Sequence, residues 1–203
     1  MRYKNFDIAE VSDQAIAIVD DFGPNFTSGT NVLILLQRKK DGGHNKEFRR
    51  RLSWFVVHNQ EHYISALTKL LVMKYAFHDQ DLRIYATVNP RSLKKAEKLF
   101  KQTMLELDFS SEENHNYFWQ RLESKWISAL MNNKSRDRSY FQWDIDDIDG
   151  QDQHGSFLKE LPEDTEIIKQ YRTKNGWHII TKPFNPDVLS LSPQRDGMLL
   201  LAY

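Results

Sequence analysis

The sequence predicts an α+β protein in which helices pack against a mixed or mostly antiparallel sheet. The first reason is the order of the expected elements: two strands, a helix, a strand, two helices and then three or four strands, without the regular alternation of a doubly wound sheet. The second is composition, since hydrophobic residues make up 40% of the chain and supply enough apolar surface for a sizeable core. A length of 203 residues suits a single domain.

The first expected elements are apolar runs separated by turn residues. Residues 32–37 form an aliphatic run that predicts a buried strand, and Asp41-Gly42-Gly43 is typical of a turn. Residues 52–57 then return as the second strand of a hairpin. Apolar residues near helical spacing across 61–77 predict an amphipathic helix. Residues 1–31 have a mixed pattern, to which no element is assigned.

The middle of the chain predicts one strand and two helices. Residues 83–88 alternate in polarity like a strand, which the Asn89-Pro90-Arg91 sequence ends. Ser92 is a typical N-cap for a helix over residues 93–107. Apolar positions on or near one face across 113–131 predict a further helix.

The last third of the chain predicts strands with little helix between them. Residues 140–145 predict a strand that runs into an acidic cluster, and residues 147–163 predict a loop. Residues 166–171 and 177–181 predict two strands joined by Thr173-Lys174-Asn175-Gly176, because Asn-Gly is the strongest short-range hairpin signal. Residues 198–203 predict a final short strand.

Charge is balanced overall but unevenly distributed along the chain. Lys plus Arg and Asp plus Glu number 28 each, so the net charge indicates no partner, whereas basic residues crowd 38–51 and acidic residues crowd 144–152. The absence of cysteine excludes disulfides and thiolate metal sites. Apolar runs such as residues 32–36 are far too short to span a bilayer. We therefore expect a cytoplasmic protein with no membrane partner.

Two carboxylates in the acidic cluster are candidate metal ligands. On a strand over 140–146, Asp144 and Asp146 point to the same face. Two carboxylates at that spacing stay ionised together at low cost only when a cation compensates them. Hard cations such as Mg²⁺ and Mn²⁺ prefer such oxygen ligands and also take substrate phosphate oxygens. The alternative interpretation is a solvated acidic loop.

A histidine follows the expected hairpin turn. On a strand that starts near Gly176, Trp177 and Ile179 face one side, and His178 and Ile180 face the other. An imidazole in that position can donate a hydrogen bond to a phosphate oxygen. The alternative is a structural histidine whose hydrogen bonds are satisfied within the fold.

These motifs together resemble those of the archaeo-eukaryotic primase superfamily, which includes primase-polymerases. The family's first motif is an apolar strand that ends in Asp-x-Asp, matched by Phe141-Gln142-Trp143-Asp144-Ile145-Asp146. Its second motif is a small residue, any residue and a histidine that opens an apolar strand, matched by Gly176-Trp177-His178-Ile179-Ile180. Several plasmid and phage members also carry Asn-Pro-Arg after an earlier strand, as residues 89–91 do here. The resemblance covers residues 83–182.

The resemblance implies a single domain over 1–203 with a palm-like core on an RRM-type sheet. An N-terminal lobe, 1–80, would carry a basic hairpin, and residues 81–203 would form a core of catalytic type. Asp144 and Asp146 would bind Mg²⁺ or Mn²⁺, and His178 would contact the phosphates of the incoming nucleotide. Arg91 and Lys174 would be further phosphate contacts.

The implied reaction is nucleotidyl transfer to a nucleic-acid strand. A 3′-hydroxyl of DNA or RNA attacks the α-phosphorus of a nucleoside triphosphate, and pyrophosphate leaves. The family's third motif is an aspartate on a later strand, for which Asp196 is the candidate metal ligand and Asp187 a second possibility. Neither matches that motif well. A reduced member that binds nucleic acid or a nucleotide without turnover is therefore the alternative.

Two other features carry separate hypotheses. His58-Asn59-Gln60-Glu61-His62 matches the inverted zinc-protease motif, which requires both histidines on one helix face. A strand over 54–57 would place that motif at a strand–helix junction and counts against a zinc hydrolase. The basic segment between the first two strands is a candidate contact to nucleic-acid phosphates, or else a solvated loop that protects a sheet edge. Its basic residues are Arg38, Lys39, Lys40, Arg49, Arg50 and Arg51.

Overall fold

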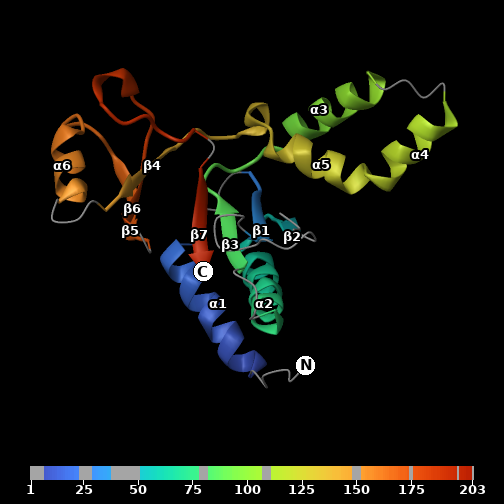
Figure 1. Ribbon diagram of the computed structural model, residues 1–203, viewed down its shortest axis with the longest axis horizontal. Helices are drawn as coiled ribbons and strands as arrows, with labels where there is room; N and C mark the ends of the chain where they lie inside the picture. The colour runs from blue at the N-terminus through green and yellow to red at the C-terminus, as the bar shows by residue number, and fades with distance from the viewer. Residues whose placement is uncertain are drawn as a thin grey trace.

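The computed structural model describes residues 7–22, 29–37, 51–77, 82–106, 111–147, 152–173, 176–195 and 197–202. Its elements (Figure 1), with 3₁₀ helices marked η, are α1 (Ile8–Phe22), β1 (Asn31–Gln37), β2 (Arg51–Val57), α2 (Gln60–Ala76), β3 (Leu82–Thr87), α3 (Leu93–Leu105), α4 (Glu112–Gln120), α5 (Leu122–Met131), η2 (Asn133–Ser135), β4 (Phe141–Asp146), α6 (Gln153–Glu160), β5 (Ile167–Arg172), β6 (Gly176–Thr181), η3 (Pro186–Val188) and β7 (Met198–Ala202). The strands form two sheets, and the pairings between neighbouring strands of the described residues are antiparallel, which confirms the α+β fold class. Within these ranges no helix combines the length and apolar character needed to cross a membrane.

The first sheet has the strand order β2-β1-β3-β7 and is covered by helices on both faces. Leu33 and Leu35 of β1 point into a core shared with α1 and α2, whereas Val32 and Ile34 point into a second core shared with α3 and α5. Burial on both faces explains why β1 is an uninterrupted aliphatic run rather than an alternating one. The strands β3 and β7 complete the sheet that β1 and β2 begin, so it combines segments far apart in the sequence (Figure 1).

The second sheet has the strand order β4-β6-β5 and buries one of its faces against α6. Phe141, Trp143 and Ile145 of β4 form a third core with Phe157 of α6, whose ring lies 5.1 Å from that of Trp143. The alternate residues of β4 lie on the other face, where Gln142 contacts β7 of the first sheet and Asp144 and Asp146 are exposed. This second face of the small sheet carries the polar side chains described below.

The Asn-Pro-Arg sequence forms the joint between the two sheets. Asn89 is fully buried, and its Nδ2 donates to the carbonyls of Tyr140 (3.2 Å) and Arg195 (2.9 Å), while its Oδ1 accepts from the Tyr140 N–H. Arg91 is also fully buried, and its Nη1 donates to the carbonyl of Asn132. The Asn89 bonds tie the end of β3 to the start of β4 and to the segment before β7, and the Arg91 bond ties it to the end of α5.

Helix α1 lies in a region to which the sequence pattern assigned no element. Its buried residues, Val11, Ala15 and Val19, recur every four residues and pack into the core shared with α2. This spacing is the ordinary signal of an amphipathic helix, so the signal was present in the sequence. The intervening polar residues and the Gly-Pro that follows obscured it.

Helix α6 replaces part of the loop expected over residues 147–163. Asp152 caps the helix by accepting a hydrogen bond from the Gly155 N–H at 2.8 Å. The only large apolar residue that α6 buries is Phe157, which packs against Trp143. The expectation of a loop was wrong here because a tertiary contact and a cap outweigh a Gly-containing, polar sequence.

The helix expected over 113–131 is divided into α4 and α5 at Arg121. The backbone of Arg121 leaves the helical range, with φ −116° and ψ 13°. Phe118 of α4 and Trp126 of α5 both pack against Phe100 of α3, with ring centroids 6.3 Å and 5.7 Å away. The break between α4 and α5 therefore coincides with their packing on α3, and no helix-breaking residue in the sequence marks its position.

Replacing Asn89 with alanine should destabilise the fold strongly. Asn89→Ala leaves a buried N–H and two carbonyls without their partner, so we expect a loss of about 3 kcal/mol in the free energy of unfolding, measured by urea denaturation. The exposed Asn133 is the matched control, and Asn133→Ala should change stability by less than about 0.5 kcal/mol. Equal effects of the two variants would contradict the role given to Asn89.

Candidate functional site

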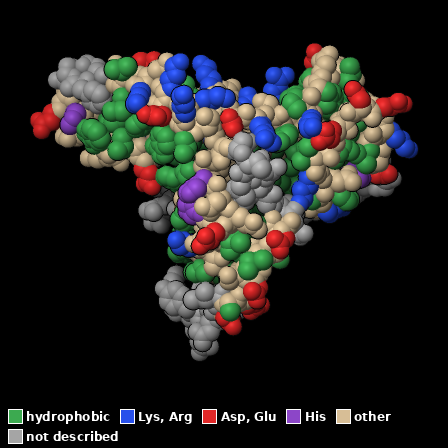
Figure 2. Space-filling model, turned by 180° about the vertical axis from the view of Figure 1, so that it is seen from behind, with side chains coloured by type: hydrophobic (Ala, Val, Ile, Leu, Met, Phe, Trp, Pro, Cys, Tyr) green, Lys and Arg blue, Asp and Glu red, His purple; other side chains and the backbone are tan. Residues whose placement is uncertain are grey.

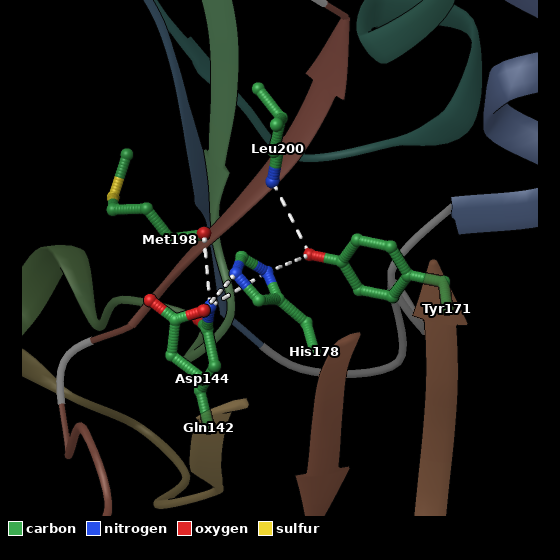
Figure 3. A network of polar contacts seen from close by, with 6 residues as sticks. All are labelled: Gln142, Asp144, Tyr171, His178, Met198 and Leu200. Carbon is green, nitrogen blue, oxygen red and sulfur yellow. Dashed lines mark hydrogen bonds and ion pairs between the residues drawn. The ribbon is translucent and has the colours of Figure 1, made fainter. Parts of the chain in front are cut away.

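An aspartate and a histidine face each other across the small sheet. The register of β4 and β6 pairs Asp144 with His178, and Nε2 of His178 lies 3.0 Å from Oδ1 of Asp144 (Figure 3). The His178 side chain is only 12% exposed, whereas that of Asp144 is 46% exposed. The pair therefore joins a nearly buried imidazole to a carboxylate that solvent reaches.

The other ring nitrogen of His178 is held from two sides. Tyr171 Oη lies 2.7 Å from Nδ1 and Gln142 Nε2 lies 3.0 Å from it (Figure 3). Burial raises the pKa of Tyr171, and the nearby charge of Asp144 raises it further, so the phenol keeps its proton. With Tyr171 and Gln142 both assigned as donors, Nδ1 is the acceptor and the ring proton sits on Nε2, aimed at Asp144.

The first sheet supports this arrangement through β7. The N–H of Leu200 donates to Tyr171 Oη at 3.4 Å, and Gln142 Nε2 is 3.4 Å from the Met198 carbonyl (Figure 3). Gly197 leaves room for Gln142, because a Cβ at that position would lie 2.0 Å from Gln142 Oε1. The site is therefore built at the contact between the two sheets.

The β4–β6 register depends on a glycine. Gly176 pairs with Asp146, and a Cβ on Gly176 would lie 1.9 Å from the carbonyl oxygen of Ile145, closer than any side chain permits. Only glycine allows this approach of the two backbones without a shift. Two residues further along β6, the same register places His178 opposite Asp144.

Asp144 and Asp146 occupy one face of β4, as their spacing predicts. Both are exposed, and the residues between and before them are buried on the opposite face. Two oxygen-donor carboxylates on one exposed face fit a hard divalent cation. Among the described residues, no group of three His, Cys, Asp or Glu is arranged to hold a metal ion, and Asp196 lies outside the described residues.

The remaining predicted site residues are either buried or lie wholly or partly outside what the structure describes. Arg91 is fully buried and bonded to the chain itself, so its side chain does not reach a solvent-borne phosphate in this conformation. Lys174 lies outside the described residues, and so do Arg38, Lys39, Lys40, Arg49 and Arg50. Arg51 begins β2, and the structure describes only its backbone.

The zinc-protease motif straddles a strand–helix junction. His58 follows the end of β2, Asn59 caps α2 by accepting from the His62 N–H at 2.7 Å, and Glu61 lies in the first turn of α2. The Nδ1 atoms of His58 and His62 lie 3.5 Å apart. Because His58 precedes the helix, the motif lacks the single helix face that zinc-protease chemistry requires.

Sequence reasoning missed Tyr171 and Gln142. Gln142 lies two residues before Asp144, so the strand alternation that placed Asp144 and Asp146 together also places Gln142 on their face. Tyr171 pairs with His178 across the β5–β6 hairpin. Its position follows from the hairpin register, which the Asn-Gly signal indicates only approximately.

Tyr171 also lines a cavity of about 370 Å³ between the helical layer and the two sheets. The cavity wall combines apolar residues of α1, α2 and β7 with the polar side chains of Lys74, Arg172 and Thr173. Tyr171 thus contacts His178 through its hydroxyl and borders this cavity.

Comparisons of the chain with protein-family models, with curated proteins and with solved structures return no match.

Substituting Gly176 with alanine should disrupt the pairing of β4 with β6. The added methyl group would collide with the Ile145 carbonyl, so we expect Gly176→Ala to cost about 1–3 kcal/mol in the free energy of unfolding and to weaken amide-exchange protection in β4 and β6.

The control for this variant is Gly155→Ala in α6. A Cβ on Gly155 meets only the carboxylate end of Asp152. Rotating that carboxylate away gives up its N-cap bond to the Gly155 N–H, and the preference of a helix for alanine over glycine, about 1 kcal/mol, offsets this loss. Gly155→Ala should therefore leave stability nearly unchanged. Unaltered stability and exchange in Gly176→Ala would show that the register does not depend on this glycine.

Proposed function

We propose that this protein transfers nucleotides to a nucleic-acid strand with the help of a divalent cation, in the manner of primase-polymerases. The observation that carries the proposal is the Asp144–His178 pair on the exposed face of the small sheet, next to Asp146. A pair of carboxylates suits a hard divalent cation, and an imidazole N–H can donate to a phosphate oxygen of a bound triphosphate. The resemblance of the sequence motifs to those of the primase superfamily supports the same proposal.

Each side chain has a defined role in this proposal. Asp144 and Asp146 would hold Mg²⁺ or Mn²⁺, and when bound, such ions activate the attacking 3′-hydroxyl and neutralise charge on the leaving pyrophosphate. His178 would donate its Nε2–H to a phosphate oxygen. Tyr171 and Gln142 would hold Nδ1 as the acceptor, so that the donor proton stays on Nε2.

Binding of a cation and a nucleotide would replace the contact between Asp144 and His178 by contacts to these ligands. In the structure, the Nε2–H of His178 is engaged by Asp144 at 3.0 Å. A cation at Asp144 and a phosphate oxygen at His178 would replace this contact by two charge-assisted ones. Nucleotide and cation should therefore bind together, and each should bind more weakly without the other.

The nucleic-acid strand that accepts the nucleotide is part of the same proposal. The basic segment leaves the first sheet between the end of β1 at Gln37 and the start of β2 at Arg51. Cationic side chains on such a connection contact phosphates without reading the base sequence. DNA or RNA is therefore the proposed acceptor, and a nucleoside triphosphate is the proposed donor.

A second candidate function is a binding module of the same fold without turnover. The observation that favours it is that the described residues contain two carboxylates at the site and no group of three metal ligands. Such a module would bind nucleic acid or a nucleotide. Primer-extension assays separate the two candidates, because only the transferase lengthens a primed template.

Calorimetric titration of ATP and dATP tests the proposed site. With Mn²⁺ the wild type should bind, and Asp144→Asn/Asp146→Asn should weaken metal-dependent binding by about a hundredfold, because the loss even of groups that merely orient metal ligands costs about 10–100-fold. The control Asp137→Asn/Asp164→Asn removes two exposed carboxylates elsewhere and should bind like the wild type. Undiminished binding by the Asp144/Asp146 variant would reject the metal site, and absence of wild-type binding would reject the transferase.

A further inference from the structure

Three distant segments meet next to the joint between the sheets. The Ser92 N–H donates to the Ser135 carbonyl at 2.7 Å, and Lys95 Nζ donates to the Arg136 carbonyl at 2.7 Å, so the start of α3 is bonded to η2 and its flanks. Nη1 of Arg136 donates to the Arg195 carbonyl at 2.7 Å, which brings in the segment before β7. Residues 92–98, 132–138 and 194–195 thus form one surface, called here the junction surface.

The junction surface is strongly basic although the chain as a whole is neutral. Figure 2 shows Lys and Arg side chains gathered along the upper edge of the molecule, over the start of α3 and the neighbouring η2. Most of these residues are exposed, and Arg136 is half-buried. The basic residues of the surface are Lys94, Lys95, Lys98, Lys134, Arg136, Arg138 and Arg195.

Few carboxylates within the junction surface offset this charge. Glu97 is ion-paired with Lys101 one turn further along α3, at 2.5 Å, so its charge is already compensated. Asp137 is the other described acidic residue of the three segments. Lys95 and Arg136 are also held in place, because both donate to main-chain carbonyls, which carry no net charge.

The surface is connected to the Asp144–His178 pair. Gln142, which contacts His178, forms two backbone hydrogen bonds with Gln194, immediately before Arg195 (Gln142 N–H to Gln194 carbonyl, 3.1 Å, and the reverse, 2.7 Å). A ligand chain that lies on the junction surface would therefore pass close to the exposed end of the candidate site.

We propose that the junction surface binds the phosphate backbone of single-stranded nucleic acid. Charges spread over three rigidly joined segments suit a run of regularly spaced phosphates, which Lys and Arg contact without reading sequence. The start of α3 adds the positive end of a helix dipole to the same surface. If the proposed transfer occurs, this surface would hold its strand, but the binding itself requires neither Asp144 nor a cation.

Salt-dependent binding of a labelled oligothymidylate, measured by fluorescence anisotropy in EDTA without nucleotide, tests the proposal. Lys94→Gln/Lys98→Gln/Lys134→Gln removes three exposed charges. Because each phosphate contact to a single strand contributes about 0.7 to the slope of log K against log salt, the variant should lose about 2 units of slope. At 0.1 M salt its affinity should fall by about a hundredfold.

The matched control removes the same net charge elsewhere. Lys69→Gln/Lys159→Gln/Lys182→Gln alters exposed lysines on α2, on α6 and after β6, and it should keep the wild-type slope. Asp144→Asn/Asp146→Asn should also bind the oligonucleotide normally, which separates this proposal from the proposed transfer. An unchanged slope in the junction variant, equal losses in the control, no wild-type binding, or equal affinity for polyglutamate would each overturn the proposal.

Discussion

The backbone register between β4 and β6 is the constraint on which the candidate site depends. Gly176 permits an approach to Ile145 that any side chain would block, and this approach fixes which residues of the two strands lie opposite each other. Asp144 and His178 are one such pair. A slip of one residue would turn every side chain of β4 to the other face and would put Trp143 where Asp144 stands.

The site lies between two sheets, so both sheets contribute to it. The small sheet supplies Asp144, His178, Gln142 and Tyr171, and β7 of the first sheet supplies the N–H of Leu200 that bonds to Tyr171 Oη. The bonds of Asn89 to Tyr140, at the start of β4, join these sheets. The same joint gathers the cations of the junction surface, which places the proposed strand-binding surface beside the proposed nucleotide site.

The sequence predicts most of this arrangement where periodicity is strong. Alternation along β4 and β6 places Asp144 with Asp146 and His178 with Ile180, and the structure confirms both faces. Periodicity alone does not reveal α6, which forms around the burial of Phe157 against Trp143. Nor does it reveal that Arg91 is buried, because that depends on how residues 132–138 return to the end of β3. Contacts between distant segments are what single-sequence patterns leave out.

The most direct test of the account is a titration with paramagnetic Mn²⁺ in the presence of a nucleoside triphosphate, followed by NMR of the histidine rings. The chain has 7 histidines, so each serves as a reporter for its own part of the molecule. His178 should broaden first, because it lies against Asp144, while the His58 and His62 rings should stay sharp. Broadening at His58 and His62 with a sharp His178 would contradict it.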